Sequence, residues 1–156
     1  MTDPIKLIGN VASPYTRKMV AYLRYKRIPY EVIWGQPEDI LKKMNIEPPK
    51  PILLPVFILD RDGQATAVTD STPLIREFED KYPDRSVLPN NPALNFINFV
   101  LEDFGDEWCT KFMFHYRWHF DEDADNAGTI LPLGINSNLK DDELAFFKEH
   151  FAKRQI

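Results

Sequence analysis

The apolar positions in the first half of the chain follow two spacings. Short apolar or alternating runs predict strands, and longer stretches with apolar residues three or four positions apart predict helices. The predicted strands cover residues 5–10, 30–34, 55–59 and 65–69. The predicted helices cover residues 14–26, 37–44 and 71–81. Since strand and helix alternate at the start, we expect the first two strands to pair in parallel.

The last two strands are expected to form an antiparallel hairpin. They are separated by Asp60-Arg61-Asp62-Gly63-Gln64, whose Asp-Gly step supplies the positive φ angles of a tight turn. The proline-rich segment 47–51 suits neither a helix nor a central strand and reads as an extended loop before Leu54-Pro55. The resulting order, βαβ followed by ββα, is the thioredoxin topology with a mixed four-stranded sheet.

The second half of the chain is predicted to be helical and rich in aromatic residues. Nine of the eleven phenylalanines lie beyond residue 92. Residues 92–118 contain no helix breaker stronger than Gly105, so they predict one helix about 40 Å long. Its first half is apolar nearly all round, so it needs cover from the first domain, from further helices or from another chain.

After this helix, residues 121–138 read as a loop because they combine an acidic run with Gly128, Pro132 and Gly134. A final amphipathic helix is predicted over residues 140–154, with Leu144, Phe147 and Phe151 on one stripe. These two helices are all that the second half is expected to hold. The predicted domains are therefore residues 1–82, a linker at 83–91, and a partial all-α domain at 92–156.

Composition narrows the classes of partner. The formal charge is −5, the basic residues are scattered and the isoelectric point is near 5.2, which argues against a nucleic-acid or anionic-membrane surface. One cysteine, Cys109, cannot make an internal disulfide, and its aromatic surroundings predict a buried, inert thiol. The sequence predicts no signal peptide, membrane-spanning run or lipidation site, so the cytoplasm is the expected compartment.

Candidate chemistry lies where the first strand meets the first helix. Ser13 and Pro14 open the helix, so the Ser13 hydroxyl lies among unpaired backbone N–H groups at the positive end of the helix dipole. Such a position stabilises an anion, and a thiolate is the natural one. The plain alternative is that Ser13 only caps the helix.

Four features in register resemble the glutathione S-transferase superfamily. They are Ser13 at the active-site turn, the Leu54-Pro55 pair opening a strand, the acidic-Ser pair Asp70-Ser71, and the helix that follows. The resemblance implies a cytoplasmic, homodimeric transferase that binds glutathione as its substrate and uses no metal. Its thioredoxin-like domain would activate the glutathione thiol for attack on a small electrophile, which the sequence does not identify.

The resemblance also implies a role for each residue. Ser13 would donate a hydrogen bond to the glutathione sulfur, with Tyr15 as a second donor. Leu54 would offer its backbone N–H and C=O to the cysteinyl part of glutathione, with Pro55 following a cis bond, and an ordinary trans proline is the alternative. Asp70 and Ser71 would hold the γ-glutamyl end, or else serve as plain helix caps.

Three further features carry candidate roles. Lys50 would pair with the glycyl carboxylate of glutathione. Glu102, Asp103, Asp106 and Glu107 are either solvated surface charge or carboxylates lent to a neighbouring subunit. His115 and His119 lie one helical turn apart, yet the glutamate of a zinc-binding HExxH pattern is missing, so they are expected to be partly buried beside Trp118.

Two rival functions follow from the departures from the family. A typical member has a larger helical domain, so the partial one here indicates either a truncation or a short variant. A non-catalytic homologue that serves as a binding or protein-interaction module is therefore the alternative to the enzyme. Thiol–disulfide exchange is disfavoured because Ser13 and Thr16 stand where redox members carry cysteines.

Overall fold

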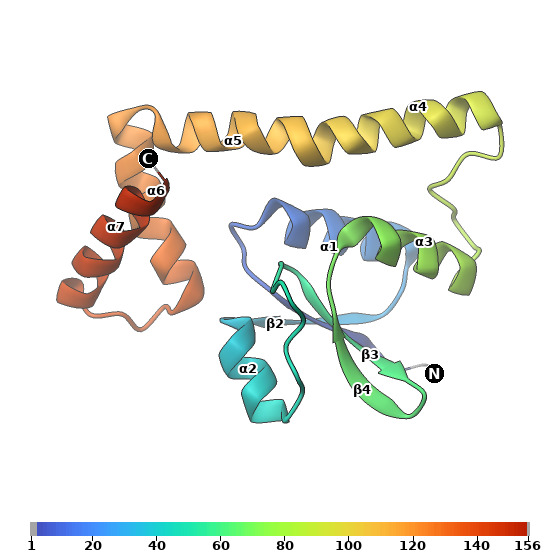
Figure 1. Ribbon diagram of the computed structural model, residues 1–156, viewed down its shortest axis with the longest axis horizontal. Helices are drawn as coiled ribbons and strands as arrows, with labels where there is room; N and C mark the ends of the chain where they lie inside the picture. Colours follow the sequence, from blue (N-terminus) through green and yellow to red (C-terminus); the bar gives the residue numbers. More distant parts are fainter. Residues whose placement is uncertain (1–2, 156) are drawn as a thin grey trace. The chain divides into compact units, whose positions relative to one another are not determined.

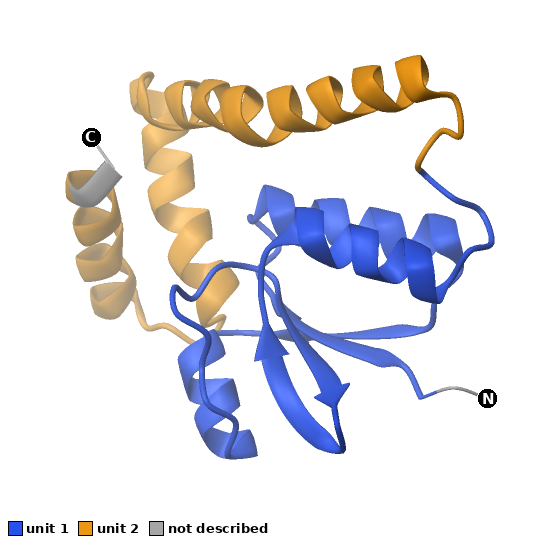
Figure 2. Ribbon diagram, turned by 45° about the vertical axis from the view of Figure 1, so that its right-hand side comes forward, with its two compact units in different colours: residues 1–87 blue, residues 88–156 orange. Residues whose placement is uncertain are grey.

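The computed structural model of the protein describes residues 3–155. The chain forms two compact units, Met1–Val87 and Leu88–Ile156, which are shown in blue and orange in Figure 2. The division falls inside segment 83–91, the expected linker.

The first unit is built on a mixed four-stranded sheet (Figure 1). Its strands are β1 (Ile5–Gly9), β2 (Tyr30–Trp34), β3 (Val56–Arg61) and β4 (Gln64–Val68), in the spatial order β2-β1-β3-β4. β1 pairs with β2 in parallel, whereas β3 runs antiparallel to both β1 and β4. The expected topology is therefore confirmed, with β3 and β4 displaced by one or two residues from the predicted ranges.

Two helices cover one face of this sheet and a third covers the other (Figure 1). α1 (Pro14–Lys26) and α3 (Ser71–Lys81) share a core with Leu7 of β1 and Phe57 of β3. α2 (Pro37–Met44) packs through Leu41 against the neighbouring residues Ile8 and Val56, which point to the opposite face. The alternation of side chains along β1 and β3 thus supplies both cores.

The turn between β3 and β4 forms as the Asp-Gly step predicts. Asp62 and Gly63 have φ angles of 55° and 82°, the left-handed conformation at both central positions of this hairpin type. The Gly63 N–H donates to Asp60 Oδ1 at 2.8 Å, which satisfies a backbone donor at the exposed tip. The hairpin sets the register in which Phe57 faces Val68.

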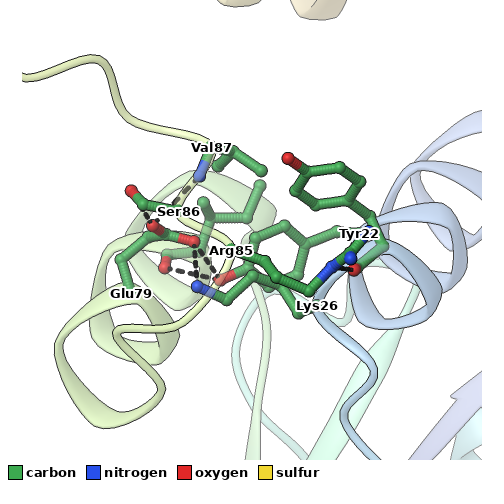
Figure 3. Close-up of polar contacts among 8 residues, drawn as sticks. Tyr22, Lys26, Glu79, Arg85, Ser86 and Val87 are labelled. Carbon is green, nitrogen blue, oxygen red and sulfur yellow. Dashed lines mark hydrogen bonds and ion pairs between the residues drawn. The ribbon is translucent and has the colours of Figure 1, made fainter.

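A buried carboxylate joins α1, α3 and the segment after α3 (Figure 3). Glu79 accepts hydrogen bonds from the Tyr22 hydroxyl at 2.8 Å, from Ser86 Oγ, and from the Val87 N–H at 3.2 Å. Lys26 Nζ lies 2.9 Å from Glu79 Oε1 in an ion pair, and both side chains are almost fully buried. This network fixes the two helices that lead to the candidate site.

Helices joined by short connections make up the described part of the second unit. α4 (Pro92–Asp103), the π-helical segment η1 (Phe104–Trp108) and α5 (Cys109–Trp118) follow one another without interruption. The long helix expected over residues 92–118 is thereby confirmed, with a π turn at its middle. α6 (Asp121–Ile135) and α7 (Asp141–Gln155) complete the unit, and no described helix is long and apolar enough to cross a membrane.

The prediction of a loop over residues 121–138 is wrong, because α6 occupies most of that segment. Its acidic run, Asp121 to Asp123, forms the first helical turn, where negative side chains favour the helix dipole. Gly128 permits close contact with α7, since a Cβ atom there would lie 2.9 Å from Lys148 Cγ. Pro132 is buried inside the helix, so packing outweighs its missing backbone donor.

Three more expectations about this unit need correction. It holds α6 as well as the two expected helices, so the helical part is larger than the pattern indicated. Cys109, the first residue of α5, is exposed rather than buried. His115 and His119 are exposed too, and their rings stack at 4.5 Å rather than packing into a core.

Candidate functional site

Strand register brings the ends of three elements to one edge of the sheet. β1 ends at Gly9 beside the start of β3, since Ile8 faces Val56. β4 ends at the same edge, because Val68 faces Phe57. The Ser13 turn after β1, the Leu54-Pro55 pair before β3 and the Asp70-Ser71 pair after β4 therefore lie along that edge, although up to 58 residues separate them in sequence.

Local hydrogen bonds shape the turn that carries Ser13. The Ser13 side chain accepts from the Thr16 N–H at 3.2 Å and so caps α1. Asn10, which is buried, accepts from the Ala12 N–H through its side chain and from the Ser13 N–H through its carbonyl. The Arg17 Nε donates to the Val11 carbonyl at 2.8 Å. The half-buried Ser13 oxygen is thus fixed at the helix terminus.

The Ser13 cap leaves the hydroxyl proton available. The oxygen acts as the acceptor toward Thr16, and within residues 3–155 the serine side chain has no acceptor for its own proton. A hydroxyl in this state can donate to an added anion without losing its capping bond. Capping and donation, the two readings of Ser13, are therefore compatible in this geometry.

The close contact between β1 and α1 depends on Gly9. A Cβ atom at this position would lie 2.5 Å from Thr16 Cγ2. Thr16 is fully buried, and its hydroxyl accepts from the Asn10 N–H at 3.4 Å. Gly9 thereby lets α1 start close to the end of β1, which places Ser13 over the sheet edge.

A second helix terminus lies at the start of α3. The Asp70 side chain caps this helix by accepting from the Thr72 N–H at 3.3 Å, and Asp70 has a φ angle of 81°. A positive φ in a residue other than glycine costs free energy and often occurs where a site needs a particular backbone direction. Ser71, the first residue of the helix, is 7% exposed.

Lys18 is a site residue that the sequence reasoning missed. Its Nζ donates to Ser71 Oγ at 3.2 Å, so a cation from α1 lies at the N-terminus of α3. An ammonium and a helix N-terminus both favour an anion, and here they coincide. The only signal in the sequence is that Lys18 follows Ser13 by little more than one helical turn. Its partner is 53 residues away and follows only from the fold.

The residues before β3 are placed in part as expected. The expected cis peptide bond between Leu54 and Pro55 is confirmed, and a second one joins Lys50 to Pro51. Leu54 is half-buried and Pro55 is buried at the sheet edge. Lys50 is exposed and makes no hydrogen bond or ion pair with the described residues, so its role stays a prediction.

The other candidate residues are Tyr15 and four acidic residues of the second unit. Tyr15 is half-buried in the first turn of α1, beside Ser13. Glu102 and Asp106 are half-buried and Asp103 and Glu107 exposed, all in the second unit. Across residues 3–155, no three histidine, cysteine, aspartate or glutamate side chains gather as a metal site would require. A hollow of about 540 Å³ is lined by residues of α2 and the segment after it, and none of them is a predicted site residue. They are Glu38, Lys42, Asn45, Ile46, Glu47 and Pro48.

Comparison with known proteins gives one family match. Residues 7–86 match the sequence model of the glutathione S-transferase N-terminal domain, which covers half of the chain. Among curated proteins, no significant match was found. The family match includes every predicted site residue.

Solved structures show the same fold at low identity. A glutathione S-transferase from Methylobacterium radiotolerans, in complex with glutathione sulfonate, has a TM-score of 0.56 and 20% identity over 98% of this chain and 64% of its own. The Tau class glutathione S-transferase from mango has a TM-score of 0.55 and 23% identity, over 83% of this chain and 60% of its own. Maleylacetoacetate isomerase from Anaeromyxobacter dehalogenans, with glutathione bound, has a TM-score of 0.57 and 14% identity, over 97% of this chain and 82% of its own. The chain thus spans less than two thirds of the length of the first two.

Proposed function

The chain belongs to the glutathione S-transferase superfamily, and on that premise we propose that it binds glutathione at the Ser13 edge of the sheet and activates its thiol. The observation that carries the proposal is the pairing of two helix N-termini at this edge. One has the Ser13 hydroxyl as its cap, and the other has the Lys18 ammonium against Ser71. Glutathione carries a thiol, which suits the Ser13 terminus, and an α-carboxylate, which suits the terminus with Lys18 and Ser71.

In this proposal Ser13 acts on the sulfur. Its hydroxyl donates to the glutathione sulfur, and the start of α1 adds its positive dipole, so the thiolate is favoured over the thiol. A free thiol has a pKa of about 8.5, and comparable settings lower it to about 7 or below. The thiol proton leaves to solvent, and the thiolate then forms a C–S bond with the electrophile as its leaving group departs or its double bond accepts the electron pair.

The remaining residues bind the two ends of the tripeptide. Ser71 and Lys18 take the γ-glutamyl carboxylate, while Asp70 faces the ammonium of the same end. Leu54 offers its backbone to the cysteinyl residue as a short β-augmentation, and Pro55 follows it into the sheet. Tyr15 is a second donor near the sulfur, and Lys50 takes the glycyl carboxylate.

The solved relatives support glutathione as the ligand, since two of them contain glutathione or its sulfonate. They do not identify the electrophile. We also propose the cytoplasm as the compartment and a homodimer as the assembly, in line with the family. Transfer of the glutathione thiol to a small electrophile is part of the same proposal.

The test is calorimetric titration with glutathione of the wild type, Ser13→Ala and Ser13→Thr, with the ultraviolet thiolate absorbance of the bound ligand recorded for each. We expect the thiolate signal in the wild type and in Ser13→Thr, which keeps a hydroxyl. We expect its loss in Ser13→Ala, with binding retained through the α3 end. Ser137→Ala, on an exposed serine of the second unit, is the matched control.

Two outcomes would overturn the proposal in separate ways. Absence of glutathione binding in the wild type rules out the ligand. Binding with the same thiolate signal in Ser13→Ala rules out Ser13 as the activating group. Because Ser13 also caps α1, the variants are first compared by thermal unfolding, where the cap is expected to account for about 0.5–2 kcal/mol.

A second candidate function is a non-catalytic binding or interaction module of the same family. It is favoured by the exposure of large apolar side chains on α4, where Phe96 and Leu101 are 66% and 64% exposed. Turnover with a generic aromatic halide separates the two candidates. Product formation that depends on Ser13 supports the enzyme, and glutathione binding without turnover supports the module.

A further inference from the structure

Two of the three histidines of the chain lie one turn apart at the C-terminal end of α5. His115 belongs to the last turn of the helix and His119 is its C-cap, whose N–H donates to the His115 carbonyl at 2.9 Å. Residues four apart on a helix share one face, so both side chains project from the same side of α5. Both are exposed, and their rings stack with centroids 4.5 Å apart and an interplanar angle of 25°.

Phe120 holds this histidine pair from the other side of a corner in the chain. It is the N-cap of α6, and the corner between α5 and α6 is visible in Figure 1. Its ring makes edge-to-face contacts with His119 at 4.9 Å and with His115 at 6.1 Å between centroids. These contacts restrict the rotation of both imidazoles, which lowers the conformational entropy that a ligand must remove when it binds.

The surroundings of the pair favour a cation. The last backbone carbonyls of α5 form the negative end of the helix dipole, where positive charge is stabilised. Directly after the pair, the first turn of α6 adds Asp121, Glu122 and Asp123, all of them exposed. The imidazoles therefore lie between a helix C-terminus and a short acidic run, which together raise the local concentration of cations.

The two cationic side chains of α5 make their contacts elsewhere. Lys111 precedes His115 by one turn, but its Nζ lies over the Trp108 ring, 4.8 Å from the centroid. Arg117 donates to Met113 Sδ at 3.2 Å, and residues 113 and 117 are on a different face of the helix from residues 115 and 119. Each contact runs toward the N-terminal end of α5, away from the corner at which the pair ends.

We propose that His115 and His119 together bind one divalent late transition-metal ion, and that Cu²⁺ and Ni²⁺ bind more tightly than Co²⁺. Imidazole nitrogen suits these metals, and affinity for a given site rises from Co²⁺ through Ni²⁺ to Cu²⁺. Two histidines four residues apart are also the arrangement in which one helix offers two ligands to a single zinc ion. Two nitrogens on one ion, at bond lengths of about 2.0–2.1 Å, lie roughly 3 Å apart. Rings 4.5 Å apart reach that separation by rotation of their side chains.

The pair provides an exchangeable site and not a permanent one. Two imidazoles fall short of the three or more side chains that hold a permanent ion, and residues 3–155 bring no third histidine, cysteine, aspartate or glutamate to them. Water completes the coordination, and the acidic run acts through its charge. Because the pair lies in the second unit and includes no residue of the Ser13 edge, this binding goes beyond the proposed function and stands or falls separately from it.

The first test is calorimetric titration with Ni²⁺ alone of the parent chain, His115→Gln, His119→Gln and His150→Gln. All are made in a Cys109→Ser background, so that the single thiol binds no metal. His150 is the matched control, since it is exposed on α7 and stacks on Phe146 rather than on another histidine. Circular dichroism checks that every variant keeps its helices.

We expect one Ni²⁺ per chain in the parent and an unchanged affinity in His150→Gln. Loss of an outer partner of a metal ligand already weakens metal binding about 10–100-fold, so loss of a ligand in His115→Gln or His119→Gln is expected to cost about tenfold or more. The double variant is expected to bind little more weakly than either single variant, because each substitution alone removes the chelate. Losses that add would mean two separate ligands and would overturn the shared site.

The second test separates the histidine pair from the acidic run by competition with Mg²⁺ at constant ionic strength. Mg²⁺ binds carboxylate and water oxygens and has little affinity for imidazole. An excess of Mg²⁺ is therefore expected to leave Ni²⁺ binding unchanged, and Co²⁺ is expected to bind more weakly than Ni²⁺. Displacement of Ni²⁺ by Mg²⁺, equal Ni²⁺ affinities of His119→Gln and His150→Gln, or no binding of Ni²⁺ by the parent chain overturns the proposal.

Discussion

The Lys18 ammonium lies 3.2 Å from Ser71 Oγ and so connects α1 to the first residue of α3. Ser71 is 7% exposed and is the first residue of α3, the end at which a helix has unpaired N–H groups. An ammonium and the N-terminus of a helix both favour an anion. In the proposed function this pair of residues receives the γ-glutamyl carboxylate of glutathione.

Lys18→Met is expected to weaken glutathione binding about tenfold, because one charge-assisted hydrogen bond to the carboxylate is lost. Calorimetry at low and at high salt measures the effect, which is expected to shrink as salt rises. Lys6→Met removes the same charge from an exposed position on β1 and is the matched control. Equal affinities for Lys18→Met and the wild type would show that this ammonium does not contact the ligand.

A thiol placed at the α1 terminus is expected to be acidic. In a Cys109→Ser background, Ser13→Cys puts its sulfur among the same backbone N–H groups, and comparable positions lower a cysteine pKa from about 8.5 to about 7 or below. The pH dependence of alkylation by iodoacetamide measures that pKa. The exposed Cys109 of the wild type is the comparison. A Ser13→Cys thiol that titrates no lower than Cys109 would mean that this terminus does not stabilise anions.

The Glu79 network is expected to make stability depend on acid pH. Burial by itself raises the pKa of Glu79, but the hydrogen bonds from Ser86, Lys26 and Tyr22 outweigh it, so the pKa of Glu79 lies below its ordinary value. A lowered carboxyl pKa adds stability above the unfolded-state value of 4.5, and that stability is lost as the pH falls through the folded-state pKa. Urea unfolding between pH 7 and pH 3 measures this loss.

Glu79→Gln is expected to cost about 3–5 kcal/mol at pH 7, because it leaves the Lys26 ammonium buried without its counter-charge. The same variant should also flatten the fall in stability below pH 4.5. Glu77→Gln breaks the exposed pair with Arg61 and is expected to cost less than about 1 kcal/mol. Equal losses in the free energy of unfolding for the two variants would show that the buried ion pair stabilises the fold no more than the exposed one. The double variant Lys26→Met with Glu79→Gln tests the pairing directly, because it removes both charges.

Gly9→Ala is expected to destabilise the fold by about 1–3 kcal/mol, since its Cβ atom would lie 2.5 Å from Thr16 Cγ2. Thr16→Ser removes that methyl group but keeps the hydroxyl that accepts from Asn10. The double variant should therefore regain part of the loss in thermal unfolding. An additive double variant would show that the strain lies elsewhere.

The sequence predicted most elements of the first unit because local signals agreed there. Pro14 and Pro37 open their helices, and the bounds of α1, α2 and α3 match those expected from the pattern. The Asp-Gly step predicted the β3–β4 turn from its φ requirement alone. α6 was missed because Gly128, Pro132 and Gly134 are breakers by local propensity, whereas in the fold Gly128 lies against Lys148 of α7 and Pro132 is buried.

By itself the sequence determined the residue types at the candidate site and the order of the elements that carry them. Ser13 was identified from its position at a helix start, since capping is a local property, whereas Leu54 and Ser71 were assigned through the family resemblance. The tertiary structure alone decided that Lys18 meets Ser71 and that Glu79 is buried with Lys26. It alone showed Cys109 to be exposed after a π turn. Contacts across 50 residues and helix phase are set by packing of the whole fold, which no short window of sequence contains.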